Sequence, residues 1–422
     1  MRALRPRQLP GVNDINGERL LEDLRDLSAI GGRLDGGLDR LAWSAADLEG
    51  RQWFAERLGG CGLEARFDQA LNVFGHLPGA RGPFVLTGSH LDSVPSGGRL
   101  DGAYGAVAAL EVLRTLVESK DPVAGQVEVV GFADEEGVRF ESGLIGSKAL
   151  CGELDIEALA GRHDWTGLPI PEVLRGAGVE LARMNDARSH LPQVARFLEL
   201  HIEQGPRMEA SATELGVVTG IVNVHRELIT INGMQNHAGT TPLNLRHDAG
   251  RAATRITGQV KELVQSVDHD AVANVGVMRF EPGAVNVIPG RAEFTLEVRH
   301  LDEDVVRQIT ERIHDRLAEV CGEEACRFQI EPLSDVPGAA MDPGIMATLD
   351  RVCEDLGRTH RRLWSGAGHD AQVLARHVPA GMLFVPSRKG ISHAPGESTE
   401  DAHLVLGARA LLAGVRAILA NP

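Results

Sequence analysis

Apolar and polar positions follow two alternating patterns along the first half of the chain. Residues 16–33 and 44–60 have apolar side chains at helical spacing, and the second stretch begins at Ser44, a residue type that caps helices. Beyond them, short apolar runs alternate with further helical stretches, and such runs are typical of strands buried on both faces of a parallel sheet. The pattern predicts an α/β fold with a mostly parallel sheet. The expected strands are residues 84–87, 127–133 and 194–200, and the expected helices are residues 103–117 and 143–150.

A different pattern occupies the middle of the chain. Between about 213 and 330 the expected order is strand, helix, strand, strand, helix, which is typical of a small α+β domain with an antiparallel sheet. From residue 366 the first pattern returns, with a strand at 381–385 and a helix at 402–419. We therefore expect a catalytic domain formed by residues 1–212 and 331–422, interrupted by an inserted domain at 213–330. The elements expected in the insert are strands 222–232, 273–279 and 292–300 and helices 248–264 and 305–320.

Length and charge bound the possible partners. A chain of 422 residues fits two hydrophobic cores, because single cores stop growing near ~250–300 residues. Apolar residues make up 43% and charged residues 24%, as in ordinary globular proteins. The formal net charge of −16 opposes binding to phosphate backbones and anionic lipid surfaces. We therefore expect no nucleic-acid partner and no membrane partner, and an anionic substrate would need local positive charge.

The cysteines and the N-terminal segment indicate the cellular compartment. The cysteines number five and contain no Cys-x-x-Cys pair, which argues against a disulfide framework and against a thiolate zinc site. The basic residues after Met1 are followed by no apolar segment, and no uninterrupted apolar run of 18 residues is present. We therefore expect a cytoplasmic protein with reduced thiols.

Polar residues with metal-binding chemistry follow the first expected strand of the sheet. The glycine-rich loop 88–102 contains His90, Asp92 and Asp101. An imidazole and a carboxylate suit a zinc-like or manganese-like ion, and Asp92 can orient the His90 ring from behind. The alternative is a polar loop in which Asp101 caps a helix.

A second polar cluster, residues 133–137, follows the next expected strand. Its adjacent carboxylates would repel one another unless a cation neutralises them. Glu136 can bind such a cation, while Glu135 stays free as the base that takes a proton from a metal-bound water. A solvated acidic segment on the surface is the alternative.

Two histidines complete the possible site. His201 follows the third expected strand, and His393 lies in a turn near the C-terminus. A single histidine is more often a core or surface group than a ligand. Together with the carboxylates, however, the two give the stoichiometry of a two-metal hydrolytic site, in which the ions lie ~3.5–4 Å apart. Ligands of α/β sheets bind at the carboxyl ends of the strands, and no Gly-x-Ser-x-Gly motif competes with this interpretation.

Three further candidates lie in the insert. His237 can donate a hydrogen bond to a developing oxyanion. Asn286 and Arg299 are candidates for a carboxylate clamp, because an arginine fork matches carboxylate geometry. Arg299 could equally be one half of a surface ion pair.

These motifs together resemble those of the hydantoinase/carbamoylase branch of the aminoacylase-like metallopeptidases, which includes N-carbamoyl-L-amino-acid hydrolases, β-ureidopropionases and allantoate amidohydrolases. The resemblance runs from about residue 16 to 418. It implies a phosphorylase/hydrolase-like catalytic domain, interrupted by a ferredoxin-like lid and dimerisation domain. It also implies two divalent ions, with Zn, Mn, Co and Ni as candidates. The residues that match the ligands are His90, the bridging Asp101, Glu136, His201 and His393, while Glu135 matches the general base and Asp92 the supporting carboxylate.

The resemblance extends to substrate contacts and to assembly. It implies a homodimer in which His237 reaches into the site of the neighbouring subunit. Gln204, after Glu203, favours the ureido-cleaving branch over aminopeptidases and dipeptidases, since its amide can bond a ureido group. Tyr104 and Lys389 depart from the usual pattern and could tune substrate preference. The residues in substrate-contact segments are Gln204, His237, Asn286, Arg299, Gly368 and His369.

The expected reaction is hydrolysis of a linear ureido C–N bond, in which an N-carbamoyl-L-amino acid and water give the L-amino acid, CO₂ and ammonia. Allantoate or ureidoglycolate hydrolysis is the nearest alternative, followed by a dipeptidase or aminoacylase of the same clan. A metal-binding protein without turnover is the alternative from another class. Glu135 argues against it, because binding alone needs no free base beside the ions.

Overall fold

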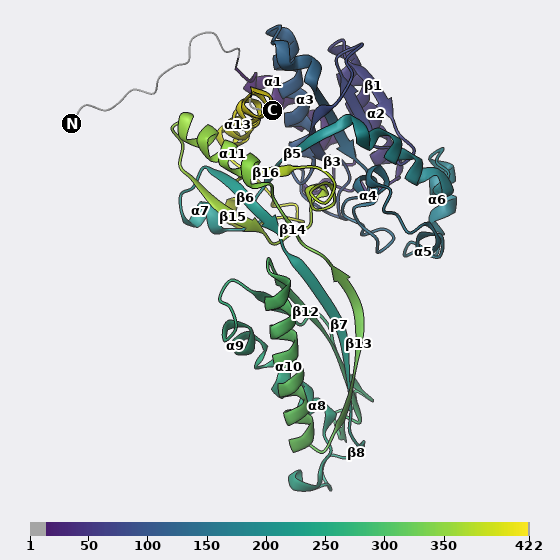
Figure 1. Cartoon of the computed structure of the whole chain (residues 1–422). Helices are drawn as coiled ribbons and strands as arrows, with labels where there is room; N and C mark the ends of the chain where they lie inside the picture. The colour runs from purple at the N-terminus through teal and green to yellow at the C-terminus, as the bar shows by residue number, and fades with distance from the viewer. Residues whose placement is uncertain (1–13, 421–422) are drawn as a thin grey trace, which may run out of the picture. The chain divides into compact units, whose positions relative to one another are not determined.

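The computed structural model describes residues 14–420, which divide into two compact units. Unit 1 combines the chain up to Gly220 with the chain from Ala340 onward, and unit 2 is Ile221–Ala339 (Figure 1). A discontinuous domain with one insert is therefore present. Both limits of the insert lie later in the chain than the 213 and 330 expected from the sequence.

Unit 1 is built on a nine-stranded mixed sheet. Its centre is parallel, with β4 (Val127–Phe132), β3 (Phe84–His90), β5 (Val194–Ile202) and β16 (Ala380–Val385) side by side. Every residue of β3, β4 and β16 is buried, as the unbroken apolar runs predicted. The remaining strands are β2 (Val73–His76) and β1 (Glu64–Phe67) beyond β4, and β6 (Leu215–Ile221), β14 (Ala339–Ala340) and β15 (His360–Ser365) beyond β16.

The helices of unit 1 pack in two groups. The first contributes to one large core together with the sheet, and the second forms a smaller core around Trp43 and Phe140. The first group is α1 (Gly17–Ala29), α2 (Ala45–Gly60), α3 (Ala103–Glu118), α11 (Pro343–Asp355) and α13 (Asp401–Ala420). The second is α4 (Ile145–Cys151), α5 (Ile156–Ala160), α6 (Ile170–Gly176) and η2 (Leu181–Gln193).

One helix among the described residues, α13, is long and apolar enough to cross a membrane by length and hydropathy alone. The helix contains no uninterrupted apolar run of 18 residues and was therefore not expected to be a membrane span. Leu404, Leu411 and Val415 of this helix are buried in the large core, where α13 packs against α3 and α11. This packing accounts for the apolar character of the helix.

Tyr104 on α3 belongs to the same core. Its side chain is completely buried, and its hydroxyl donates a hydrogen bond to the carbonyl oxygen of Leu404 at 2.7 Å. The hydroxyl lies so close to α13 that a Cβ on Gly407 would come within 2.2 Å of it. Tyr104 therefore joins two helices. Because no part of its side chain is exposed to a ligand, the structure gives no support to the expectation that it tunes substrate preference.

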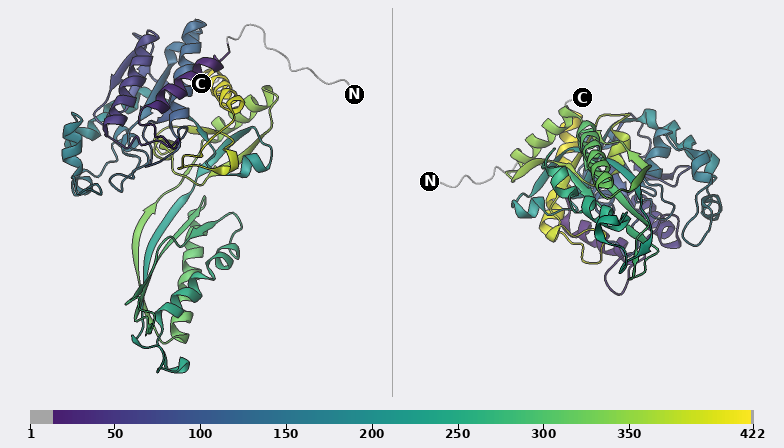
Figure 2. Two further views of the ribbon diagram at one scale, coloured as in Figure 1. Left: turned by 180° about the vertical axis from the view of Figure 1, so that it is seen from behind. Right: turned by 90° about the horizontal axis from the view of Figure 1, so that it is seen from below.

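Unit 2 is a five-stranded antiparallel sheet with helices on one face, visible from both sides in Figures 1 and 2. Alternate residues of the long strand β12 (Arg291–His300) are buried in a core shared with α8 (Ala249–Thr257) and α10 (Glu303–Glu323). Its strand order is β10 (Met278–Glu281), β12, β7 (Asn223–Asn232) and β13 (Arg327–Val336), and β9 (Val272–Asn274) also pairs with β12.

Three features of unit 2 and its boundary differ from the expected pattern. The expected helix 248–264 is two helices, α8 and α9 (Val260–Gln265), which separate at Gly258, a poor helix former. The strand β13 was not expected, and it completes a β-α-β-β-α-β order and moves the end of the insert. β6 was assigned to the insert but pairs with β16 in the main sheet.

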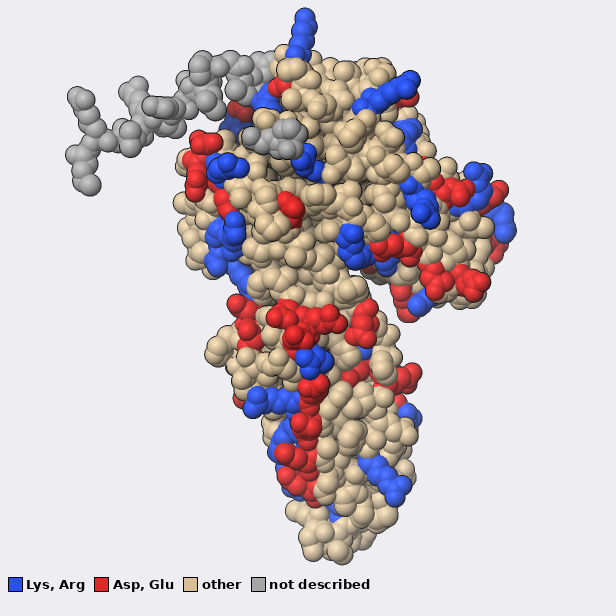
Figure 3. Space-filling view, viewed as in Figure 1, with Lys and Arg blue, Asp and Glu red and all other residues tan. Residues whose placement is uncertain are grey.

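The surface carries the excess negative charge of the sequence. On the face drawn in Figure 3, Asp and Glu side chains gather over unit 2, with Lys and Arg side chains between them. This distribution agrees with the formal net charge of −16. An anionic ligand therefore needs a local cationic group to bind.

Candidate metal centre

All five predicted metal ligands come together at the carboxyl edge of the parallel strands. His90 is the last residue of β3, and His201 is near the end of β5. Glu136 follows β4, and His393 follows β16 after a longer loop. Because these strands are parallel, their carboxyl ends share one edge of the sheet. The groups that could hold an ion are His90–Asp101–His201, His90–Glu135–Glu136 and Asp101–Glu136–His393.

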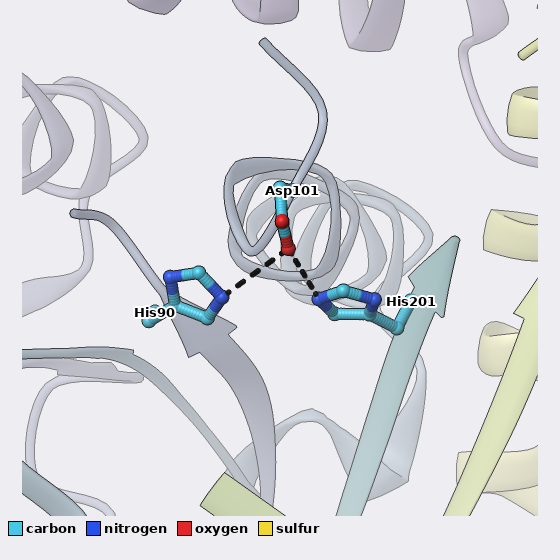
Figure 4. A group of neighbouring side chains, drawn as sticks. All are labelled: His90, Asp101 and His201. Atoms are coloured by element: carbon cyan, nitrogen blue, oxygen red, sulfur yellow. Dashed lines mark ion pairs between the residues drawn. The ribbon is translucent and has the colours of Figure 1, made fainter. Parts of the chain in front are cut away.

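Asp101 lies between His90 and His201 (Figure 4). Its Oδ1 is 3.2 Å from Nε2 of His201 and 3.6 Å from Nε2 of His90, while its Oδ2 is 3.1 Å from Nε2 of His393. Nε2 of His393 is also 3.5 Å from Oε2 of Glu136. Ligands of a tetrahedral zinc ion lie about 3.4 Å apart, given Zn–N distances near ~2.1 Å. The spacing and donor set therefore fit two cations bridged by Asp101.

Hydrogen bonds set the tautomers of the two buried histidines. Nδ1 of His90 is 3.1 Å from the carbonyl oxygen of Asp92, and Nδ1 of His201 is 2.9 Å from that of Ile202. A carbonyl oxygen can only accept, so each Nδ1 carries the proton and each Nε2 keeps its lone pair. Both rings therefore present the correct atom to a metal ion.

The carboxylate of Asp92 supports the site in a different way from the one expected. It accepts hydrogen bonds from the backbone N–H groups of Glu135 and Glu136, both at 3.2 Å. Its Oδ1 is 3.8 Å from Nδ1 of His90, beyond hydrogen-bond distance, and the ring is held instead by the Asp92 carbonyl. Asp92 therefore fixes the loop of the base with its side chain and the His90 ring with its backbone.

The backbone is strained at three positions in or next to the centre. Asp134, Gln204 and His393 are non-glycine residues with φ of 48°, 56° and 53°. This left-handed conformation is unfavourable for such residues and often occurs at functional sites. Gly102 has a φ of 63°, and a Cβ there would come within 2.4 Å of the His90 ring. Only glycine therefore lets Asp101 and His90 approach each other.

Burial and charge set the protonation of the central carboxylates. Burial raises the pKa of Asp101, but in the metal-free protein the neighbouring imidazoles of His201, His393 and His90 outweigh burial and hold the pKa well below its usual range. Burial raises the pKa of Glu135 well above its usual range, with His90 opposing and Glu136 adding to the shift. Asp101 is thus an ionised bridge, and Glu135 is a carboxyl group that holds a proton readily.

Three predicted substrate-contact residues lie beside the centre. A Cβ on Gly368 would be 3.7 Å from Oε1 of Glu135, so this glycine borders the base. The buried His369 ring packs edge-on against His201, with centroids 4.5 Å apart, and its Nε2 is 2.8 Å from Oγ of Ser365. Nε2 of Gln204 donates to Oδ2 of Asp101 at 2.9 Å, while its buried Oε1 has no hydrogen-bond partner within the described chain. That oxygen is available to a ligand N–H group.

The three predicted residues of unit 2 fall into two places. His237 in β8 (Asn236–His237) pairs with Val287 in β11 (Val287–Ile288), and the N–H of Ala238 donates to the carbonyl oxygen of Asn286 at 3.0 Å. His237 and Asn286 are therefore neighbours, and both are exposed.

Arg299 lies toward the opposite end of the same sheet. It is eight residues along β12 from Arg291, which pairs with Asn232 at the end of β7 that precedes β8. At ~3.3 Å per residue this separates it from that end by about 26 Å. Nε of Arg299 donates to Glu297 at 2.8 Å. The expected clamp of Arg299 with Asn286 therefore does not form within one chain.

Sequence reasoning missed Glu199, which supports the centre from inside the sheet. One of its oxygens accepts from Oγ of Ser89 at 2.7 Å and the other from the N–H of Ala371 at 2.9 Å. It thus joins the residue before His90 to α12 (Asp370–Leu374), which follows His369. A charged residue inside an apolar strand, two positions before His201, was the available signal, since unpaired glutamates are rarely buried.

Comparison with known proteins identifies the family. The model of peptidase family M20/M25/M40 matches residues 86–417. An allantoate amidohydrolase of Escherichia coli (strain K12) is 37% identical over 392 residues, 92% of this chain and 95% of that protein. A crystal structure of an amidase of the hydantoinase/carbamoylase family from Burkholderia multivorans matches with a TM-score of 0.86 and 33% identity, over 96% of this chain and 98% of that one. The chain belongs to the hydantoinase/carbamoylase family.

A second relative shows the range of substrates within the hydantoinase/carbamoylase family. An N-carbamoyl-L-amino acid amidohydrolase of Geobacillus stearothermophilus is also 37% identical, over 94% of this chain and 97% of that protein. The chain is accordingly a metal-dependent C–N hydrolase of the M20 family that acts on ureido compounds. The donor set around Asp101 fits the metal pair of that family.

Metal loading of this amidohydrolase should release protons. A hydrogen bond to Asp101 raises the pKa of His393 to about 9, and the charge of Glu136 adds to the shift although burial opposes it. In the metal-free protein at pH 7.5, His393 therefore holds a proton that an incoming ion must displace. Titration with Mn²⁺ by calorimetry, in buffers of different ionisation enthalpy, should show proton release and an affinity that rises from pH 6 to pH 9.

The control is His393→Ala, which removes this proton and should release about one proton fewer than the wild type. Proton release that is the same in both proteins, or an affinity that does not change with pH, would contradict the assignment of His393 as a ligand.

Proposed function

We propose that this amidohydrolase cleaves a linear ureido C–N bond in a substrate that carries a carboxylate, with N-carbamoyl-L-amino acids as the preferred class. The observation that carries the proposal is Glu135, a buried carboxyl group beside the bridging Asp101 whose Oε2 is 3.8 Å from Nε2 of His90. The hydrogen bonds from Glu135 and Glu136 to Asp92 hold this base in place. Such a group suits proton transfer at the reacting centre.

The residues of the site support a hydrolytic sequence. Two divalent ions held by the ligand set, with Zn, Mn, Co and Ni as candidates, would supply Lewis acidity and lower the pKa of a water molecule. Glu135 accepts the proton of the attacking water and later returns it to the leaving nitrogen. The free Oε1 of Gln204 accepts an N–H of the ureido group. Hydrolysis of one C–N bond gives a carbamate and an amine, and the carbamate then breaks down to CO₂ and a second amine. The final products are the amino acid, CO₂ and ammonia, which account for the substrate and one water.

Recognition of the substrate carboxylate is assigned to Arg299. Its guanidinium is oriented by Glu297, which also accepts from Nε of Arg226 at 2.6 Å. A planar guanidinium binds a carboxylate through two parallel hydrogen bonds. The excess negative charge of the chain makes such a local cation necessary.

The remaining two recognition residues are assigned to a neighbouring subunit of a homodimer. A separation of about 26 Å along the sheet prevents one small substrate from touching both Arg299 and His237 of the same chain. Apolar side chains flank His237 and Asn286 in the sequence and are exposed, as a surface covered by a partner requires. These side chains are Leu243, Leu245 and Val285.

Allantoate hydrolysis is the second candidate. The Escherichia coli allantoate amidohydrolase is as similar to this chain as the Geobacillus stearothermophilus enzyme. Allantoate also carries a carboxylate and ureido groups, so the same centre and the same arginine could serve it.

A substrate panel separates these candidates. Purified protein loaded with Mn²⁺, Co²⁺ or Zn²⁺ should release ammonia from N-carbamoyl-L-amino acids with a higher kcat/KM than from allantoate, ureidoglycolate or N-carbamoyl-β-alanine. Dipeptides, assayed for free amino acids, serve as the control for the peptidases of the same clan. A kcat/KM highest for allantoate would select the second candidate, and cleavage of dipeptides alone would overturn ureido hydrolysis.

The role of Glu135 can be separated from that of a metal ligand. Glu135→Gln should keep both ions and lose at least ~10²-fold in kcat, the usual scale of acid–base catalysis. Glu136→Gln, the matched control one residue away, should lose metal as measured by elemental analysis. A Glu135→Gln protein with wild-type kcat would show that another group is the base.

Mixed dimers test the placement of His237. Glu135→Gln and His237→Ala proteins, each of low activity alone, are mixed in equal amounts under exchange conditions. If His237 serves the neighbouring site, each hybrid dimer has one intact site, and about a quarter of wild-type activity should return. If His237 serves its own chain, every site of the mixture lacks one residue and no activity returns.

A further inference from the structure

Glu397 is a buried carboxylate that joins two loops from opposite ends of the chain. It is 4% exposed and belongs to none of the possible ion-binding groups. Its Oε1 accepts from the N–H groups of Leu100 and Asp101 at 2.8 and 3.1 Å. Its Oε2 accepts from Oγ of Ser392 at 2.7 Å. Both oxygens are therefore engaged in hydrogen bonds that hold the two loops together.

The space for this carboxylate is provided by a glycine. A Cβ on Gly98 would lie 2.0 Å from Oε1 of Glu397. The loop that ends in Asp101 thus passes over the carboxylate in direct contact. This close approach indicates that the loop and Glu397 form one fixed unit.

The two loops that Glu397 joins each carry a metal ligand. Asp101 is held through its own N–H, and His393 is next to Ser392. His393 needs such support more than the other ligands do, because its side chain is 49% exposed and its φ is 53°. Oγ of Ser392 is also 3.4 Å from Oδ2 of Asp101, the oxygen that faces His393. One carboxylate therefore fixes the relative position of two ligands that are far apart in sequence.

We propose that Glu397 is a positioning residue that sets the affinity of one ion position, the one formed by Asp101, Glu136 and His393. The inference rests on the two-metal centre of the proposed function. The other position depends much less on it, because His90 and His201 are on the buried strands β3 and β5 and their rings are fixed by backbone carbonyls. Loss of Glu397 should therefore weaken one ion and spare the other.

A carboxylate is better suited to this position than its amide. Glutamine keeps one oxygen for the two backbone N–H groups but offers an NH₂ group to Ser392. The hydrogen bonds from the backbone N–H groups then have a neutral acceptor in place of a charged one. Hydrogen bonds to a charged acceptor are roughly twice as strong as neutral ones. Glu397→Gln should therefore weaken the ion less than Glu397→Ala.

The test is metal binding by the stripped proteins. Wild type, Glu397→Ala, Glu397→Gln and His393→Ala are titrated with Co²⁺, followed by calorimetry and by visible absorption. The wild type should bind two ions. Both Glu397 variants should keep one tight ion, and the affinity for the other should fall by about 10–100-fold in Glu397→Ala, the range seen when residues that support metal ligands are removed. His393→Ala removes a ligand of the position formed by Asp101, Glu136 and His393, so the Co²⁺ absorption that it retains identifies the other ion position.

Glu400→Ala and Glu400→Gln are the matched controls, since Glu400 is an exposed glutamate three residues away. Both should bind as the wild type does. If Glu397→Ala does not fold, Glu397→Gln and Ser392→Ala carry the test, with the same selective loss expected.

The outcomes separate the inference from the proposed function. A wild type that binds fewer than two ions would contradict the two-metal centre itself. A wild type that binds two ions, with Glu397 variants that bind both equally well or lose both equally, would overturn the positioning role alone.

Discussion

The bridging carboxylate of Asp101 is the interaction on which the rest of the site depends. Three segments of the chain must meet around it, since one oxygen faces His90 and His201 and the other faces His393. Buried acidic groups surround it, and their mutual repulsion in a low-dielectric interior favours cations at this place. The parallel centre of the sheet provides the meeting point, and the left-handed backbone at Gly102 allows the approach to His90.

The fold could be predicted from the sequence where the spacing of apolar residues alone distinguishes a helix from a strand. The buried strands β3, β4 and β16 are unbroken apolar runs, and the insert differs in pattern from its surroundings. The boundary at β6 was misplaced because a strand adjoining an insert has the same local sequence pattern whichever sheet it joins. β13 was missed because none of its residues is fully buried, so its sequence lacks a clear alternation of apolar and polar side chains. Pairing partners are set by long-range contacts, which local pattern does not encode.

The residues of the site also divide into those that local sequence predicts and those that depend on long-range contacts. The metal ligands are predictable because histidines and carboxylates at strand ends are few and chemically distinct. Glu397 was missed because its proposed role depends on contacts with Leu100 and Asp101, almost three hundred residues away in sequence. The side chain of Asp92 was expected at the His90 ring and instead holds backbone N–H groups, a choice that depends on loop geometry. Arg299 and Asn286 were combined in one clamp because both are suited to carboxylates, and only the strand register separates them.

The proposed chemistry belongs to unit 1 of the chain, whereas part of the proposed substrate recognition belongs to unit 2. The proposed ligands and base lie in unit 1, where buried strands and backbone hydrogen bonds fix them. The proposed recognition residues of unit 2 lie on its surface, and His237 and Asn286 are exposed on short strands. Substitutions on such a surface cost little stability, whereas changes in the buried centre cost several kcal/mol when they leave an unpaired charge, about 3–5 kcal/mol for a broken buried pair. One catalytic centre can therefore be kept while substrate preference changes, which agrees with relatives that are equally similar to this chain and act on different ureido compounds.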